Sequence, residues 1–318
     1  MARPTTIAGT DSSAAHEWDN AAEAWNRHAP MLDAWLQTPT TAMLDAAGVG
    51  LGSSVLDVAA GAGDQTLAIA RRVGPKGHVL ATDISPRILA LAAEKLHRAG
   101  FDTVQTFVAD AQALNLGQGP HTQHRVAGFD AVVCRLGLML CPNPLAALTE
   151  ALQALRPGGR FGALVFSAPQ ANPCIMTLVT MIRRHAGLPP AVAVEPGSLL
   201  SLGHPGQMAE LMARAGFVHI DIRPMAAPMR LPDVGDYLHF VRNAASPIMA
   251  LLAALPAQAQ DAAWEDIERQ LDRFTTNGAW VGPNELLLCS ASRPQKDRTD
   301  AIGTPASIST SQPDQTRG

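Results

Sequence analysis

The sequence has few aromatic residues and little excess charge, and both shortages limit the classes of protein to which it can belong. Of its 318 residues, 4% are aromatic and 16% are charged, and the formal net charge is −4. Binding to a nucleic-acid backbone requires concentrated positive charge, so nucleic acid is not expected as a partner. The hydrophobic fraction of 47% excludes a largely disordered chain and is ordinary for a globular enzyme.

Cysteine is also scarce, and long apolar runs are missing. The 4 cysteines are Cys134, Cys141, Cys174 and Cys289. They form no CxxC pair, so we expect free thiols in a reducing cytoplasm rather than a metal or redox site. No apolar run approaches the roughly 20 residues of a membrane span, and the first residues lack the apolar core of a secretion signal. These features predict a cytoplasmic protein with no integral membrane segment and no metal.

From residue 54 to residue 166, short apolar segments alternate with amphipathic ones. This order is typical of a parallel sheet built from right-handed crossovers, and continuously apolar strands indicate that helices cover both faces. We predict strands near 54–58, 78–82, 104–108, 129–134 and 160–166, and helices near 64–73, 86–98 and 144–155. In LRPGGRFGALVF, the Pro-Gly-Gly triplet predicts a turn between the last helix and the last of these strands.

The flanking segments are expected to complete a single domain over residues 14–292. Residues 14–47 have a helical pattern interrupted by Pro30 and Pro39, and their three tryptophans either pack the helices or line a pocket; they are Trp18, Trp25 and Trp35. Segments 167–202 and 224–284 are read as mainly helical lids, separated by a helix near 206–214 and a strand near 217–223. A final strand is predicted at 285–292, and residues 1–13 and 293–318 are predicted to be disordered.

A loop with two glycines joins the first predicted strand to the first helix of this alternation. Gly61 and Gly63 allow a sharp turn and close approach of a ligand, but Thr66 occupies the third position of the dinucleotide pattern GxGxxG. The first strand carries Asp57, and Asp64 begins the helix, with no basic residue in the loop. A pyrophosphate would meet negative charge here, so the loop favours a cationic or zwitterionic ligand.

Acidic residues follow the next two strands at the same predicted edge. Asp83 can accept hydrogen bonds from the two hydroxyls of a ribose, and Asp110 can accept from the exocyclic amine of adenine while Ala111 offers its backbone N–H. Each aspartate alone could be a helix cap or a turn former. Three strand ends that suit an amino acid, a ribose and a base together predict S-adenosylmethionine as the cofactor.

The motifs VLDVAAGAGDQTLAIA, ATDIS, VADAQAL, FDAVVCRLGLMLCPNP and LRPGGRF resemble those of class I S-adenosylmethionine-dependent methyltransferases, most closely the ubiquinone/menaquinone biosynthesis C-methyltransferase-like (type 11) branch. The resemblance covers residues 55–166, with a weaker match in AGFVHIDIRP. It implies an α/β Rossmann-like three-layer sandwich whose seven-stranded, mostly parallel sheet has its last strand antiparallel. It also implies cofactor contacts at Asp57, Ala59, Gly61, Gly63, Asp83, Ile84, Asp110 and Ala111. Most class I members have glycine at the position of Ala59, whereas the quinone branch often has alanine.

Methyl transfer is mainly a positioning reaction, and a base is needed only if the acceptor must lose a proton. Arg135 follows the fourth strand. It either has a functional role, in stabilising an oxyanion or orienting the substrate, or a structural one, as an ion pair or a cap. The quinone methyltransferases similarly carry an arginine after this strand. His28 is either a base or a surface histidine.

The expected function is therefore methyl transfer to a small hydrophobic or aromatic acceptor at carbon or oxygen. Two alternatives stay open. One is a non-catalytic regulatory protein that binds S-adenosylmethionine, and the other is an NAD-dependent oxidoreductase. The latter would need GxGxxG and a catalytic Tyr or His, and the single tyrosine, Tyr237, lies in a covering segment.

Overall fold

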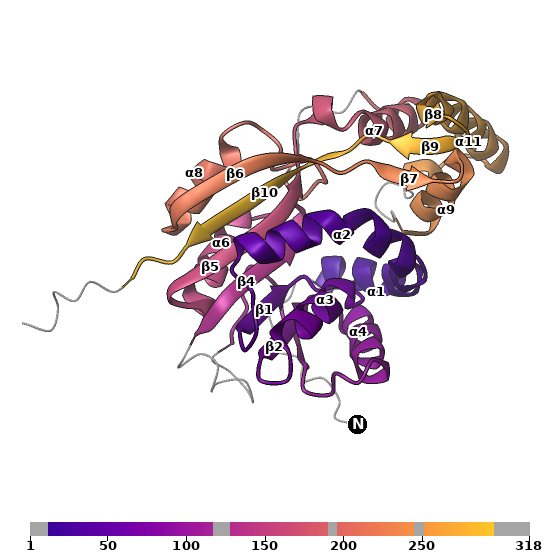
Figure 1. The fold of residues 1–318 in the computed structure, drawn as a ribbon. Coiled ribbons are helices and arrows are strands. Elements are labelled where there is room, and N and C mark those ends of the chain that lie inside the picture. Colours follow the sequence, from indigo (N-terminus) through magenta and orange to yellow (C-terminus); the bar gives the residue numbers. More distant parts are fainter. Residues whose placement is uncertain (1–11, 117–127, 190–195, 245–250, 296–318) are drawn as a thin grey trace, which may run out of the picture.

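A seven-stranded sheet forms the centre of the protein in the computed structural model, which describes residues 12–116, 128–189, 196–244 and 251–295. The strand order is β3-β2-β1-β4-β5-β10-β6, and Figure 1 labels all of these strands except β3. Strands β1 to β5 pair in parallel, whereas β10 is antiparallel to both of its neighbours, β5 and β6. The bounds are β1 Ser54–Val58, β2 His78–Asp83, β3 Gln105–Val108, β4 Phe129–Arg135, β5 Leu155–Phe166, β6 Val218–Ala226 and β10 Glu285–Ser292. The predicted α/β architecture with an antiparallel last strand is confirmed.

Helices cover both faces of this sheet. Helices α2 (Ala29–Ala46), α3 (Asp64–Val73) and α4 (Pro86–Arg98) pack on one face, and α6 (Pro144–Ala154) and α8 (Gln207–Ala215) pack on the other. Two adjacent residues of β5 show the division, because successive side chains point to opposite faces. A Cβ on Gly162 would lie 3.0 Å from the Cβ of Ala47, so its absence lets α2 approach the sheet. The ring of Phe161 packs on Phe217, which follows α8, with centroids 5.2 Å apart.

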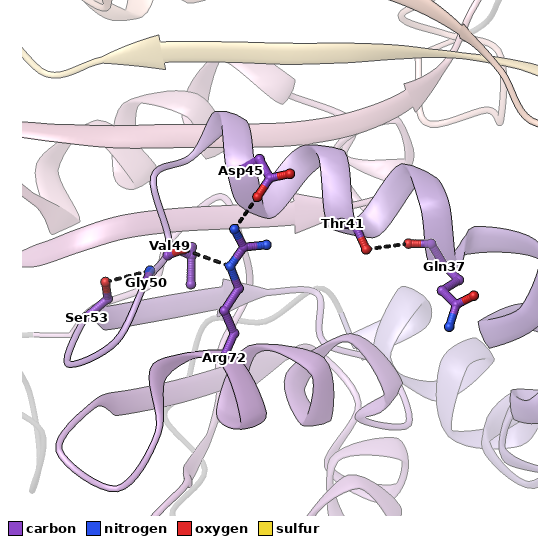
Figure 2. A network of polar contacts seen from close by, with 7 residues as sticks. All are labelled: Gln37, Thr41, Asp45, Val49, Gly50, Ser53 and Arg72. Atoms are coloured by element: carbon purple, nitrogen blue, oxygen red, sulfur yellow. Dashed lines mark hydrogen bonds and ion pairs between the residues drawn. The ribbon is translucent and has the colours of Figure 1, made fainter.

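The N-terminal helices are attached to the sheet at several points. Helix α1 (Ser12–Arg27) precedes α2, and its Asp19 accepts hydrogen bonds from the Ser85 hydroxyl and the Arg87 backbone N–H at the start of α4. Pro39 was predicted to interrupt the helical segment, but it lies buried inside α2. Arg72 of α3 fixes the last turn of α2, because its guanidinium donates to Asp45 and, over 2.8 Å, to the Val49 carbonyl (Figure 2).

A cover lies beyond the sheet and comprises helices α7 (Pro173–His185), α9 (Val234–Ala244) and α11 (Ala257–Leu271) and a second sheet (Figure 1). Its strands are β7 (Met229–Leu231), β8 (Thr275–Thr276) and β9 (Ala279–Gly282), in the order β7-β9-β8. Segment 224–284 was predicted to be mainly helical, so this sheet corrects the prediction. Its strands have only two to four residues, too short to produce a clear alternation. The role of the cover as a lid stays a prediction.

The cover has its own aromatic core. Tyr237 of α9 stacks on Trp280 of β9 with centroids 4.5 Å apart, and the Trp280 indole N–H donates to the Leu271 carbonyl over 2.9 Å. Two tryptophans tie the cover and the link before it to the N-terminal helices. Trp25 donates to the Ala244 carbonyl of α9 over 3.2 Å, and Trp35 donates to the Ala227 carbonyl, between β6 and β7, over 2.7 Å. Within the described ranges, no helix has the length and apolarity needed to cross a membrane.

The remaining differences from the predictions concern the start of strand β5 and the two ends of the chain. Strand β5 begins at Leu155, so it includes the Pro-Gly-Gly triplet that was predicted as a turn. The pairing of β4 with β5 is irregular between Phe129 and Ala131, and this irregularity accommodates the triplet. Residues 1–11 and 296–318, which hold most of the two segments predicted to be disordered, lie outside the described residues.

Candidate active site

The glycine loop between β1 and α3 has the shape that close approach of a ligand requires. Gly61 and Gly63 have φ angles of 56° and 85°, in the left-handed region that favours glycine. A Cβ added to Gly61 would meet nothing within 4 Å, so the backbone there faces open space. A Cβ on Gly63 would lie 2.9 Å from the Cβ of Ala92, so this glycine lets α3 pack against α4. Gly61 can therefore contact a ligand, whereas Gly63 serves the packing of the loop.

Ala59 also has a left-handed backbone, with φ of 55°, although alanine rarely adopts it. Its side chain points at Gly137, just after β4, where an added Cβ would lie 2.4 Å from the Cβ of Ala59. The alanine that departs from the common pattern is thus accommodated by a glycine on the neighbouring strand end.

Asp83, at the end of β2, holds the glycine loop in place. Its two carboxylate oxygens accept hydrogen bonds from the backbone N–H groups of Gly61, over 2.9 Å, and Ser85, over 3.0 Å. Burial raises the pKa of this carboxyl, and the backbone donors oppose that shift. The two oxygens together can accept about four hydrogen bonds, which leaves room for a ribose hydroxyl beside the backbone donors. Ile84 lies next to it and is partly exposed.

Asp57, within β1, is completely buried. One carboxylate oxygen accepts from the Thr66 hydroxyl over 2.6 Å, and the other accepts from the Gln65 amide nitrogen. Burial raises the pKa of Asp57 to about 6, while these two hydrogen bonds and the charge of Arg135 lower it. Asp57 therefore contributes to the site through α3 and the electrostatic field, beneath the loop rather than on its surface.

Asp110 and Ala111, after β3, form a turn at the same edge. Asp110 accepts hydrogen bonds from the backbone and side-chain nitrogens of Gln112, over 2.9 and 3.2 Å. Gln112 in turn accepts from the Asn143 backbone N–H over 2.8 Å, which joins this turn to the start of α6. The aspartate is thus a turn former, as one of the open alternatives stated, and contact with a base stays a prediction.

Arg135 ends β4 and lies close to the glycine loop. Val133 pairs with Asp57 across the sheet, and Arg135 lies two residues further on, so the two charged side chains are on the same face. The guanidinium donates to the Thr40 hydroxyl of α2 over 2.9 Å. Burial lowers the pKa of Arg135, and the nearest acidic groups, Asp57 foremost, oppose that shift.

His28, the second predicted catalytic residue, lies between α1 and α2 and faces the cover. Its ring contacts those of His239 and Phe240 of α9, with centroids 5.4 and 5.3 Å apart. Its Nε2 atom is shielded from solvent and has no hydrogen-bond partner. Burial lowers the pKa of His28, and the charges of His239 and Arg27 act in the same direction. A neutral imidazole with a free acceptor nitrogen is the state that a general base requires.

The aromatic side chains near His28 connect this position to the cofactor loop. Trp25 packs edge-on against Phe240, with centroids 5.8 Å apart, and also against the apolar cluster that contains Ala62 of the glycine loop. The structure thus brings the loop, Asp57, Asp83 and Arg135 together at one edge, and His28 is linked to the loop only through Phe240 and Trp25 among the contacts of the described residues.

Sequence reasoning missed the side chains that hold the predicted residues. Gln65 and Thr66 are 1% and 0% exposed, although polar residues on an amphipathic helix are usually assigned to its solvent face. The sequence did offer one signal for these contacts: the two residues follow Asp57 by eight and nine positions across a tight strand-to-helix turn, which brings them back toward it. The contact of Thr40 with Arg135 could not be predicted from the sequence, because the two residues are 95 positions apart.

The four cysteines are free, as predicted, and burial raises the pKa of each thiol. Within the part of the chain that the structure describes, no group of three or more His, Cys, Asp or Glu side chains could hold a metal ion.

The comparisons with known proteins agree with this geometry. Residues 33–182 match the model of the ubiE/COQ5 methyltransferase family. The ubiquinone/menaquinone biosynthesis C-methyltransferase UbiE of Hahella chejuensis is 37% identical over 133 residues, which is 42% of this chain and 50% of that protein. The enzyme of the same name from Pasteurella multocida is 36% identical over 131 residues, 41% of this chain and 46% of that protein. The chain spans about half the length of the curated relatives it matches, and the predicted resemblance is confirmed.

Solved structures share the fold at low sequence identity. The YcgJ protein from Bacillus subtilis has a TM-score of 0.53 and 16% identity, covering 81% of this chain and 99% of that one. Phosphoethanolamine N-methyltransferase 2 from Haemonchus contortus, solved in complex with S-adenosyl-L-methionine, has a TM-score of 0.51 and 17% identity, covering 85% of this chain and 57% of that one. These similarities confirm the Rossmann-like architecture.

Proposed function

We propose that this chain, whose residues 33–182 match the ubiE/COQ5 methyltransferase family, transfers the methyl group of S-adenosylmethionine to a small hydrophobic or aromatic acceptor at carbon or oxygen. The observation that carries the proposal is the hydrogen bond between the glycine loop after β1 and the end of β2. Asp83 accepts it from the Gly61 backbone N–H over 2.9 Å. This contact fixes the loop and the second strand end as one surface. Class I methyltransferases, whose motifs the sequence resembles, use S-adenosylmethionine. The H. contortus neighbour was solved with that cofactor.

The residues at this edge fit the cofactor. The open space at Gly61 admits a ligand against the backbone, and the acidic groups beneath and beside it, Asp57 and Asp83, suit a ligand that carries positive charge. The absence of a basic residue from the loop is consistent with a ligand without phosphates.

The chain's own groups position the acceptor and hold its proton. When bound, the cofactor supplies a methyl group that forms a bond to the acceptor while the carbon–sulfur bond breaks and its electron pair returns to sulfur. His28 is proposed to accept the proton of a hydroxyl acceptor at Nε2, which has no other partner. The cover and Trp25 are proposed to exclude water from the loop.

The test uses the full chain with methyl-labelled S-adenosylmethionine and a metabolite extract. We expect label in a small apolar product, and no transfer by a His28→Asn variant to an acceptor that must lose a proton. Asp83→Ala should weaken cofactor binding markedly in titration calorimetry. Cofactor binding without turnover would favour the regulatory alternative, and a preference for NAD would contradict the proposal.

A further inference from the structure

A cavity lies at the edge of the sheet opposite the glycine loop. It has a volume of about 250 Å³ and is bounded by the link from α2 to β1, the start of β4 and the first residues of β5. Strand β1 begins on this side, at Ser54, and ends next to the glycine loop at Val58, so the length of β1 separates the cavity from the proposed cofactor site. Two arginines line it, Arg156 and Arg160, and we call it the basic cavity. They flank the Pro-Gly-Gly triplet, a motif that the proposed function does not use.

Arg160 brings a positive charge to the basic cavity that nothing in the described chain compensates. Its guanidinium forms no hydrogen bond or ion pair with any described residue. Its aliphatic stem packs beside Gly48, where an added Cβ would lie 3.1 Å from the Cδ atom of Arg160. The stem is therefore confined while the charged end lines the cavity with its N–H donors available.

Other arginines near this edge have structural partners. Arg72 donates to two acceptors in and after the last turn of α2, and Arg293 donates to three carbonyls around the end of α6. The last turn of α2 does not need Arg160, because the backbone N–H groups of residues 47–49 already donate to the carbonyls of residues 43–45. Capping of this helix therefore does not account for Arg160.

Asp130 fixes Arg156 at the wall of the basic cavity. One carboxylate oxygen of Asp130 accepts from Nε of Arg156 over 2.5 Å, and the other accepts from the Ser54 backbone N–H over 2.8 Å. This bond at Nε leaves the terminal nitrogens of Arg156 without an acceptor among the described residues. The cavity thus has a net positive charge, although the whole chain has a formal net charge of −4.

The link of residues 47–53 forms another wall of the basic cavity, and hydrogen bonds fix it. The Gly50 N–H donates to the Ser53 hydroxyl over 3.0 Å (Figure 2). The Gly52 N–H donates to the carbonyl of Val73, the last residue of α3, over 2.8 Å. A wall that is ordered before binding lowers the entropic cost of taking up a ligand.

We propose that the basic cavity binds a phosphate group, with the guanidinium of Arg160 and the terminal nitrogens of Arg156 donating to its oxygens. Two guanidinium groups match a dianion with three terminal oxygens better than they match a carboxylate, which has a single charge and two oxygens. The volume of about 250 Å³ is below the roughly 300–1,000 Å³ of sites for drug-sized ligands. It suits inorganic phosphate or the phosphate end of a small monoester. This site is separate from the proposed function.

The test titrates the full chain with inorganic phosphate at low ionic strength and follows binding by phosphorus-31 nuclear magnetic resonance. We expect saturable binding of one phosphate per chain. Arg160→Gln and Arg156→Gln should each weaken it by roughly tenfold or more, because each removes hydrogen bonds between charged groups. Acetate, measured by calorimetry, should bind at least about tenfold more weakly than phosphate. Equal affinity for acetate and phosphate would contradict the assignment to phosphate.

Glycerol 3-phosphate distinguishes the two sources of a phosphate group. Tighter binding of this ester than of inorganic phosphate assigns the basic cavity to a monoester, and equal affinity assigns it to the free anion. Both results support a phosphate site, provided that Arg160→Gln weakens the binding.

Controls separate the inference from folding and from the cofactor site. Arg98→Gln removes an exposed arginine of α4 that pairs with Glu94, and it should change phosphate affinity by less than about twofold. Phosphate should raise the melting temperature of the wild type and not that of Arg160→Gln. Saturating S-adenosylhomocysteine should leave phosphate bound.

Three results would overturn the inference: phosphate binding that does not saturate, that Arg160→Gln leaves unchanged, or that S-adenosylhomocysteine displaces. A wild-type protein that binds phosphate in this way but binds no adenosyl ligand would count against the proposed function alone.

Discussion

The contact between Ala59 and Gly137 allows a double substitution in which one change rescues the other. Gly137 has an ordinary φ of −99°, so alanine at this position meets no backbone strain. Its new Cβ would instead lie 2.4 Å from the Cβ of Ala59 and 3.2 Å from the Cys134 sulfur. Overpacking of this kind costs about 1–3 kcal/mol, so we expect Gly137→Ala to lower the free energy of unfolding by about 2 kcal/mol and to displace the cofactor loop.

Ala59→Gly alone should change stability little. Glycine removes the left-handed backbone strain of the alanine at φ 55°, which stabilises the folded state by roughly 1–2 kcal/mol. It also raises the backbone entropy of the unfolded chain, which lowers the free energy of unfolding by roughly 0.5–1 kcal/mol. In the double variant the methyl group of Ala59 is absent, and the nearest atom to the new Cβ is the Cys134 sulfur at 3.2 Å. The double variant should therefore recover at least about 1 kcal/mol of the loss caused by Gly137→Ala.

Urea unfolding of the wild type, both single variants and the double variant measures this coupling, with S-adenosylhomocysteine affinity as the functional readout. Gly50→Ala is the matched control, because a Cβ there meets nothing within 4 Å and stability should change by no more than about 0.5 kcal/mol. If the two substitutions are additive, the steric argument for a paired Ala59 and Gly137 is wrong.

Three further changes test other parts of the structure. Cofactor affinity should fall about tenfold between pH 7 and pH 5 in calorimetry, because the cationic ligand favours ionised Asp57, whose pKa is about 6; Asp57→Asn should remove this dependence. The same raised pKa means that ionisation of Asp57 costs folding stability as pH rises toward 6. Asn172→Leu should lower the unfolding free energy by roughly 3 kcal/mol, because the buried amide donates to Ser167 and accepts from the Glu285 backbone N–H; a loss below about 1 kcal/mol in urea unfolding would contradict it. Trp35→Phe removes the bond to the Ala227 carbonyl and should lower the melting temperature by about 3 °C in calorimetry.

The strand ends could be predicted from the sequence because their signals are local. Asp57 and Asp83 each sit in or at the end of a short apolar run, and the observed strands β1 and β2 end within a residue of the predicted limits. Parallel strands bring such ends to one edge by topology alone. The last strand was predicted at its observed limits, Glu285–Ser292, because it is an apolar segment that follows a long stretch with a helical pattern in the sequence.

Some contacts at and around this edge could not be predicted, since they join residues that are far apart in sequence. Thr40 meets Arg135 across 95 residues, and Trp35 reaches Ala227 across 192. No periodicity in one segment carries such information. The small second sheet was missed for a different reason: a strand of two residues, such as β8, is shorter than one period of any pattern that identifies strands.

Helix α2 connects these observations and supports a prediction of where the methyl acceptor would be selected. Its last turn is fixed to α3 through Asp45 and Arg72 (Figure 2), and its middle holds Arg135 through Thr40. Its first half instead bonds, through Trp35, to the Ala227 carbonyl in the short link between β6 and the cover. The second half of the helix is therefore tied to the proposed cofactor site, and the first half is tied to the chain that leads into the cover. Substitutions that change the methyl acceptor should accordingly lie in the first half of α2 and in α9, where His28 faces His239 and Phe240.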